Sequence, residues 1–125
     1  MENLLKLFDA EYRFALVVWD NEPVHSRKLT ELCENALGWK RATTYTVLRK
    51  LCDRGILRND KAIVTSIVKK SDVQGYESAA IVDRAFEGSL PSFITAFLKT
   101  KKISSEEAAE IQEMINSAAK EGKDG

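Results

Sequence analysis

Cysteine, histidine and long apolar runs are scarce in this chain, and each scarcity excludes a class of protein. Only two of the 125 residues are cysteines. Cys33 and Cys52 each lack a neighbouring cysteine in the sequence, so their spacing fits neither a disulfide framework nor a metal-binding motif. We therefore expect two reduced, mostly buried thiols in a cytoplasmic protein that holds no metal and no cofactor.

Apolar segments are short as well. Residues 1–13 are too charged, and their apolar run is too short, for a signal peptide. No apolar stretch approaches the roughly 20 residues that a membrane span needs. We expect a chain without a signal peptide and without a membrane-spanning helix.

A catalytic constellation is also missing. The one histidine, His25, lies in a predicted extended segment with no cysteine or paired carboxylate beside it. A histidine of this kind is more often a contact to solvent or phosphate than a catalyst. Gly75 and Gly88 do not make a phosphate-cradling loop. We expect the protein not to be an enzyme.

What the chain does contain is a division of charge. The formal net charge is zero, yet residues 1–70 hold 13 basic and 9 acidic residues, whereas residues 71–125 hold 6 and 10. Within residues 23–70 there are 11 basic and 4 acidic residues. This division indicates that the first part of the chain meets a polyanion. Chance segregation of charge in a short chain is the alternative.

Three helices are expected in the first half. The first begins at an N-cap, Asp9, and the second begins at an N-cap, Ser26, after a short extended piece at Val24-His25. The third spans about residues 41–54 and is followed by Gly55, a residue suited to the left-handed C′ position. Helix, short strand, helix, tight turn and helix is the order of a helix-turn-helix core.

The third helix has two unlike faces. Four residues at i, i+3, i+4 and i+7 form an apolar stripe: Thr44, Val47, Leu48 and Leu51. The remaining surface and the amino end carry side chains that can contact base edges or phosphates in a major groove: Lys40, Arg41, Ala42, Thr43, Tyr45, Thr46, Arg49 and Lys50. The alternative is an ordinary amphipathic surface helix.

A β-hairpin is expected directly after this helix. Residues 56–58, 59–61 and 62–68 read as strand, turn and strand, which makes a winged helix. Arg58 and Lys61 would then contact backbone phosphate. The alternative for these two charges is a solvated hairpin edge that resists aggregation.

Three more helices are expected in the second half, after N-caps at Ser71, Ser89 and Ser104. About fifty residues with narrow apolar stripes seldom fold alone, so we expect a second copy of the chain to cover them. The predicted dimerisation residues are Tyr76, Phe86, Leu90, Phe93, Ile94, Phe97, Leu98, Ile111 and Ile115. The alternative is a monomer in which these helices pack back on the first half.

The expected fold is thus mainly α, with a winged helix-turn-helix DNA-binding domain at 1–70 and a three-helix dimerisation region at 71–125. A homodimer that reads two DNA half-sites would gain affinity from effective concentration. The amino end of the second helix would set the register through Ser26, Arg27 and Lys28. A winged helix used as a protein-interaction module is the competing class, and a ligand-responsive regulator is a third possibility.

Several segments resemble a known family. They are Asp9-Ala10-Glu11-Tyr12 through Trp19, Trp39-x3-Thr43-x2-Thr46-Val47-Leu48-x2-Leu51-x3-Gly55, Phe86-x-Gly88-Ser89-Leu90, and Ile103-Ser104-x-Glu106-Glu107. In order and spacing they resemble the penicillinase and methicillin-resistance repressors, the BlaI/MecI family, which includes copper-responsive repressors of the CopY type. The resemblance covers nearly the whole chain. It implies a homodimeric winged-helix repressor of palindromic operators.

The resemblance also implies particular site residues and a partner. Thr43 and Thr46 match the recognition positions, and Lys50 stands where the family usually has arginine. In antibiotic-responsive members, a membrane sensor-protease triggers cleavage before a phenylalanine, and the matching bond here is Ala96-Phe97.

Three departures qualify this implication. Ala96 replaces the family's usual asparagine, which argues against proteolytic induction. Ala42 replaces a usual lysine, which shifts the expected base contacts to Lys40 or Arg41. Lys61-Ala62 replaces a Gly-Arg pair of the wing, and no cysteine-rich tail supports copper sensing.

Overall fold

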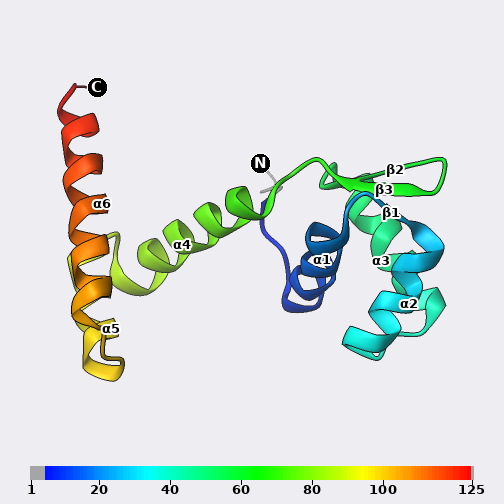
Figure 1. The fold of residues 1–125 in the computed structure, drawn as a ribbon, viewed down its shortest axis with the longest axis horizontal. Coiled ribbons are helices and arrows are strands. Elements are labelled where there is room, and N and C mark those ends of the chain that lie inside the picture. The colour runs from blue at the N-terminus through cyan, green and yellow to red at the C-terminus, as the bar shows by residue number, and fades with distance from the viewer. Residues whose placement is uncertain (1–4, 125) are drawn as a thin grey trace. The chain divides into compact units, whose positions relative to one another are not determined.

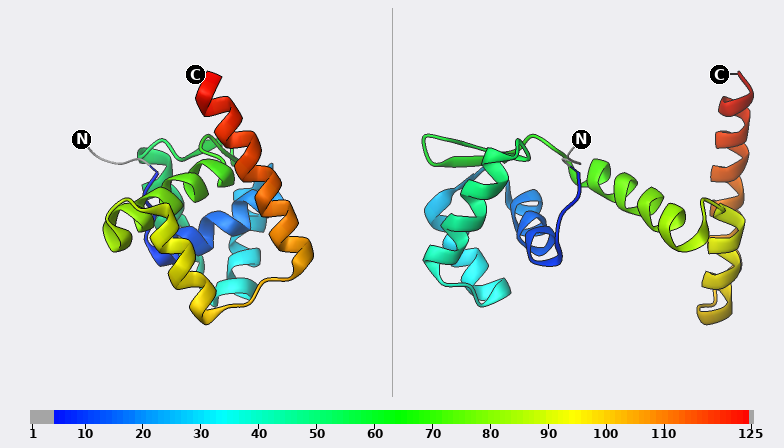
Figure 2. Two further views of the ribbon diagram at one scale, coloured as in Figure 1. Left: turned by 90° about the vertical axis from the view of Figure 1, so that its left-hand side faces the viewer. Right: turned by 180° about the vertical axis from the view of Figure 1, so that it is seen from behind.

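The computed structural model describes residues 5–124 and contains the winged helix that the sequence predicts. The elements labelled in Figure 1 are α1 (Asp9–Asn21), β1 (Val24–His25), α2 (Ser26–Leu37), α3 (Arg41–Asp53), β2 (Leu57–Asp60), β3 (Ile63–Ser66), α4 (Lys70–Phe86), α5 (Leu90–Thr100) and α6 (Ser105–Asp124). In Figures 1 and 2 the sheet lies at one side of α1, α2 and α3. The predicted mainly-α fold is therefore confirmed.

The chain divides within α4 into two compact units, Met1–Ile81 and Val82–Gly125, which we call the winged-helix unit and the carboxyl-terminal unit. The predicted domain boundary at residue 70 lies at the first residue of α4. The first turns of α4 belong to the winged-helix unit because Val73 is fully buried in its core.

Apolar stripes of the first three helices build the core of the winged-helix unit. Phe14 and Val18 of α1, Leu29 of α2 and Leu51 of α3 are all 0% exposed. Trp39, in the turn between α2 and α3, stacks on Phe14 with the ring centroids 5.7 Å apart. Burial of each such side chain contributes about 1.5–3 kcal/mol. This packing fixes which side of α3 faces outward.

The first two helices are capped by the residues that precede the predicted caps. The N-cap of α1 is Phe8 and not Asp9, and the Phe8 N–H donates to Glu11 Oε1 at 2.9 Å. The N-cap of α2 is His25 and not Ser26, because His25 Nδ1 accepts a hydrogen bond from the Arg27 N–H at 3.0 Å. The side chain of His25 therefore has a structural role, which is to cap α2.

The later caps are partly as predicted. The cap at Ser71 is wrong, because α4 already begins at Lys70, where Asp72 Oδ2 accepts from the Lys69 N–H at 3.2 Å. The cap at Ser89 is confirmed by its hydroxyl, which accepts from the Ser92 N–H at 3.1 Å. The box at the start of α6 is also confirmed, since Ser104 and Glu107 exchange hydrogen bonds.

The sheet is antiparallel with strand order β1-β3-β2. The register pairs Val24 with Val64 and Asp60 with Ile63. The predicted turn at 59–61 is wrong, because β2 continues through Asp60 and the turn consists of Lys61 and Ala62. Both turn residues have positive φ, 51° and 70°, as a two-residue type I′ hairpin requires.

Ala62→Gly is expected to raise the free energy of unfolding by about 0.5–1.5 kcal/mol, because the left-handed conformation strains every residue with a Cβ. Chemical denaturation of the two proteins measures the difference. Ala79→Gly, at an exposed position in the middle of α4, is the matched control and should lower stability by about 0.5–1 kcal/mol. Equal effects of the two substitutions would contradict the strained turn.

Side-chain hydrogen bonds hold the segment between β3 and α4. The Glu22 carboxylate accepts from the Ser66 N–H at 2.7 Å and from the Ser66 hydroxyl. Lys69 Nζ donates to the Ser66 carbonyl at 2.8 Å, and Trp19 Nε1 donates to the Val68 carbonyl at 3.1 Å. These bonds fix where α4 leaves the winged helix.

The carboxyl-terminal unit leaves its apolar side chains uncovered in a single chain. Phe86 and Phe93 make an edge-on contact, with ring centroids 5.5 Å apart, and both are only partly buried. Six other predicted dimerisation residues are between 40% and 55% exposed: Leu90, Ile94, Phe97, Leu98, Ile111 and Ile115. Tyr76 differs from these, because it lies in the winged-helix unit and is half-buried. Through Gly122, no described side chain of α5 or α6 is buried.

Candidate DNA-binding surface

The inner and outer faces of α3 lie as the sequence predicts. Thr44, Leu48 and Leu51 are buried and Val47, the fourth residue of the predicted stripe, is half-buried against the core, whereas Thr43 and Thr46 are exposed. The other exposed candidates on this helix and at its amino end are Lys40, Arg41, Ala42, Arg49 and Lys50, and Tyr45 is half-buried. The helix therefore presents two threonines and several cations to solvent along one surface.

The two threonines differ in what they can offer to a base. The Thr46 hydroxyl donates to the Ala42 carbonyl at 2.9 Å, so its oxygen can still accept and its methyl group is free for contact. Thr43 has no such bond within the described part of the chain. An acceptor and a methyl suit the amino group of cytosine or adenine and the methyl group of thymine, respectively.

Lys50 is placed differently from the other candidate cations. Its Nζ lies 3.1 Å from Glu11 Oε2, and Arg54 Nη1 lies 3.3 Å from Glu11 Oε1. Arg54 Nη2 also donates to the Lys6 carbonyl at 2.6 Å. The Glu11 side chain is only 6% exposed. Lys50, predicted as a DNA contact, therefore joins α3 to α1 through an ion pair.

The environment of Glu11 favours its charged form. Burial by itself raises the pKa of this carboxyl, but the Phe8 N–H hydrogen bond and the Lys50 and Arg54 cations together hold the pKa below its usual 4.5. Sequence reasoning missed Glu11 and Arg54. The available signal was that Glu11 shares the buried stripe of α1 with Phe14, and a carboxylate there needs a cation.

Glu11→Gln is expected to lower the free energy of unfolding at neutral pH by roughly 1–3 kcal/mol, since it leaves two cations without their carboxylate. Because the folded pKa is lowered, this stability is present above the unfolded pKa and is lost as pH falls through the folded pKa. Denaturation of both proteins from pH 7 downward should show the difference shrinking in acid. Glu34→Gln, at an exposed site on α2, is the control with little effect. A difference independent of pH would refute the ion-pair explanation.

The amino end of α2 exposes two of its three predicted contact residues. Ser26 is buried, at 7% exposed, and its N–H donates to the Ala62 carbonyl at 2.8 Å. Its side chain therefore offers little surface to a DNA phosphate. Arg27 and Lys28 are exposed, with Lys28 Nζ 3.8 Å from a Glu31 carboxylate oxygen.

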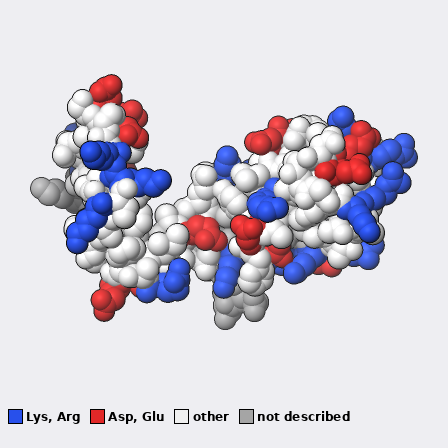
Figure 3. Space-filling view, turned by 90° about the horizontal axis from the view of Figure 1, so that it is seen from below, with Lys and Arg blue, Asp and Glu red and all other residues white. Residues whose placement is uncertain are grey.

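The hairpin adds two further exposed cations, Arg58 on β2 and Lys61 in the turn. Lys and Arg side chains gather at the right-hand end in Figure 3, the end of the winged-helix unit that α2, α3 and the hairpin form. Acidic side chains also lie there. Basic side chains are therefore concentrated at this end of the winged-helix unit, with some acidic side chains among them.

The bond between Ala96 and Phe97 lies inside α5, with Ala96 half-buried and Phe97 exposed. A protease would need this helix to open locally before it could cleave there. None of the described helices is both long enough and apolar enough to cross a membrane.

Comparison with known proteins identifies the family of this chain. A family model described as penicillinase repressor matches residues 7–117. The penicillinase repressor of Bacillus licheniformis is 24% identical over 119 residues, which cover 92% of this chain and 93% of that protein. The chain therefore belongs to the penicillinase repressor family of DNA-binding transcriptional repressors.

Proposed function

We propose that the protein is a homodimeric, cytoplasmic repressor that binds a palindromic operator through α3 and the β2–β3 wing. The observation that carries the proposal is the division of α3, where Thr43 and Thr46 face solvent among exposed cations and Thr44, Leu48 and Leu51 are buried. A helix with its apolar side held by the core is free to insert its other side into a major groove.

Affinity and sequence choice would come from different residues. Cations outside the middle of α3 would contact phosphates: Arg27, Lys28, Lys40, Arg58 and Lys61. The exposed side of α3, with Arg41, Thr43 and Thr46, would contact base edges. Lys50 would act by holding α3 against α1, because its ammonium is paired with Glu11.

The exposed apolar side chains of α5 and α6 support a dimer of this chain. A patch of large apolar residues is costly to leave in water, and a twofold partner offers the same patch in return. Proteolytic induction is not part of the proposal, because Ala96 stands where the family usually has asparagine.

A footprint on the DNA upstream of the protein's own gene tests the proposal. We expect protection of an inverted repeat whose half-sites lie one helical turn or a multiple of it apart. Titration of random duplex DNA at two salt concentrations should accompany it. Absence of DNA binding at low salt would refute the proposal and favour a protein-interaction module.

Thr46→Ala is expected to reduce discrimination between operator and scrambled DNA by about 1–3 kcal/mol, roughly 5- to 150-fold, because it removes an acceptor and a methyl from the groove. Binding to both duplexes, measured at one salt concentration, gives the ratio. Thr95→Ala on α5 is the matched control and should leave it unchanged. An unaltered ratio in the Thr46 variant would refute the assignment of α3 to the groove.

A further inference from the structure

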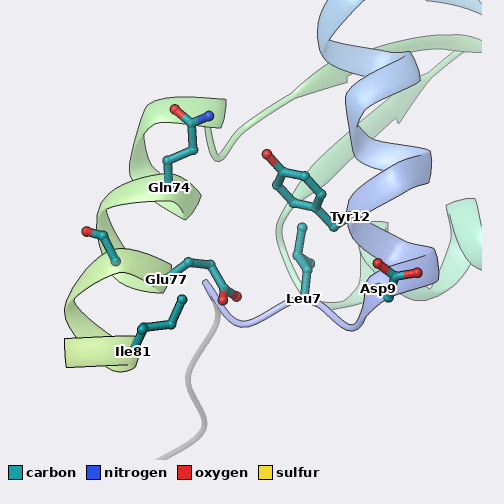
Figure 4. Close-up of a pocket in the computed structure, with 7 residues that line it drawn as sticks. Leu7, Asp9, Tyr12, Gln74, Glu77 and Ile81 are labelled. Carbon is teal, nitrogen blue, oxygen red and sulfur yellow. The ribbon is translucent and has the colours of Figure 1, made fainter. Parts of the chain in front are cut away.

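A cavity of about 490 Å³ lies between α1 and the first turns of α4, inside the winged-helix unit. Its lining residues are Leu7, Asp9, Tyr12, Gln74, Glu77, Ser78 and Ile81, most of which are labelled in Figure 4. This volume falls within the roughly 300–1,000 Å³ of small-molecule sites in proteins. None of the proposed DNA contacts is among these residues, so the cavity is separate from the DNA-binding surface.

The walls of the cavity are mostly apolar. Leu7, Tyr12 and Ile81 supply an aliphatic and aromatic lining from both sides, and Ile81 is 40% exposed. In Figure 4, Tyr12 points from α1 toward α4, and the Glu77 side chain extends from α4 toward Leu7. An apolar group of a ligand would therefore have side chains to pack against on either side.

The charged groups of the lining are both acidic. Asp9 is exposed and Glu77 is half-buried. Within the described residues, neither of these two carboxylates forms a salt bridge. The acidic partners of the ion pairs in this unit are instead Glu11 and Glu31. A carboxylate beside an apolar cavity gains from a cation, and the ring of Tyr12 also attracts cations over its face. An anionic ligand would be repelled.

We propose that this cavity is a binding site for a small apolar organic cation. The apolar part of the ligand packs between Leu7, Tyr12 and Ile81, and its ammonium group faces Glu77, with the Asp9 carboxylate adding negative charge to the rim of the cavity. Such a ligand contacts the body of the winged helix and α4 together. The site thereby adds a ligand class to a protein whose proposed function concerns DNA alone.

An NMR titration of the amide resonances with phenethylammonium tests the site, with 2-phenylethanol and phenylacetate as neutral and anionic analogues. We expect saturable shifts at the lining residues with the cation, and weaker binding of both analogues. Glu77→Gln should weaken binding of the cation about fivefold, the effect of losing one partly exposed ion pair. Glu34→Gln, on α2, is the matched control and should bind as the unaltered protein does.

Equal binding of the cation and 2-phenylethanol would overturn the proposal. An unchanged affinity for the cation in the double variant, Glu77→Gln with Asp9→Asn, would overturn it as well. No saturation at concentrations up to about 10 mM would also overturn it. An apparent affinity that falls as protein concentration rises would mean that a second copy fills the cavity, and would overturn it too. Because the titration contains no DNA, its failure would leave the proposed repressor function intact.

Discussion

Ile94→Glu combined with Leu98→Glu is expected to separate the proposed dimer into monomers and to weaken operator binding by about 10²- to 10⁴-fold. Both side chains are more than 40% exposed in the single chain and lie one helical turn apart on α5. Burying two carboxylates in the proposed interface would cost far more than their exposure in a monomer. Each winged helix would then bind its half-site without a tethered partner.

Sedimentation or light scattering measures the mass against the 14.0 kDa of one chain, and a binding titration measures the operator affinity. Ser92→Glu with Thr95→Glu adds the same charge to exposed polar positions of α5 and is the matched control. This control should remain dimeric and retain nearly all of its affinity. A double variant at Ile94 and Leu98 that stays dimeric would place the interface elsewhere.

Periodicity in the sequence was sufficient to predict which residues of α3 face inward. Thr44, Leu48 and Leu51 are buried because a helix of 13 residues with one apolar stripe has a single way to cover it. The exposure of Thr43 and Thr46 follows from the same helical periodicity, which places them outside the apolar stripe. The general location of the candidate surface could therefore be predicted without any structure.

Helix starts were predicted less well, because the caps depend on bonds that side-chain preference does not specify. Phe8 is a poor N-cap by residue type, yet the Glu11 carboxylate that binds its N–H is available only because Glu11 lies inward on α1. His25 displaces Ser26 in the same way, since the pairing of β1 with β3 places Ser26 against the hairpin backbone. Tertiary contacts decided both cases.

The hairpin turn is another element that residue preferences did not locate correctly. Asn59 and Asp60 are strong turn residues by type, but the register that pairs Asp60 with Ile63 keeps them in β2. The positive φ angles then fall on Lys61 and Ala62, which no residue preference would have selected. Burial of Val64 and Leu57 on one side of the sheet outweighs that local strain.

Raising the salt concentration from 50 to 200 mM is expected to weaken operator binding by about 10³- to 10⁵-fold, as it does for proteins that neutralise six to ten phosphates. The reason is the set of exposed cations that we assign to phosphate in each half of the proposed homodimer: Arg27, Lys28, Lys40, Arg58 and Lys61. Each phosphate contact releases counterions from the DNA, so the logarithm of the binding constant falls linearly with the logarithm of salt concentration.

Arg49 and Lys50 offer a matched pair of variants for this measurement, because both are exposed on α3 but, among residues 5–124, only Lys50 of the two has an ion-pair partner. Arg49→Gln should reduce the salt slope by about 1 for each half-site that it contacts through phosphate. Lys50→Gln should change the slope much less and instead lower the free energy of unfolding, since Glu11 loses a cation. Equal changes of slope in the two variants would show that Lys50 leaves Glu11 to bind phosphate. The comparison therefore separates a cation that we expect to contact DNA from a cation that holds α3 against α1.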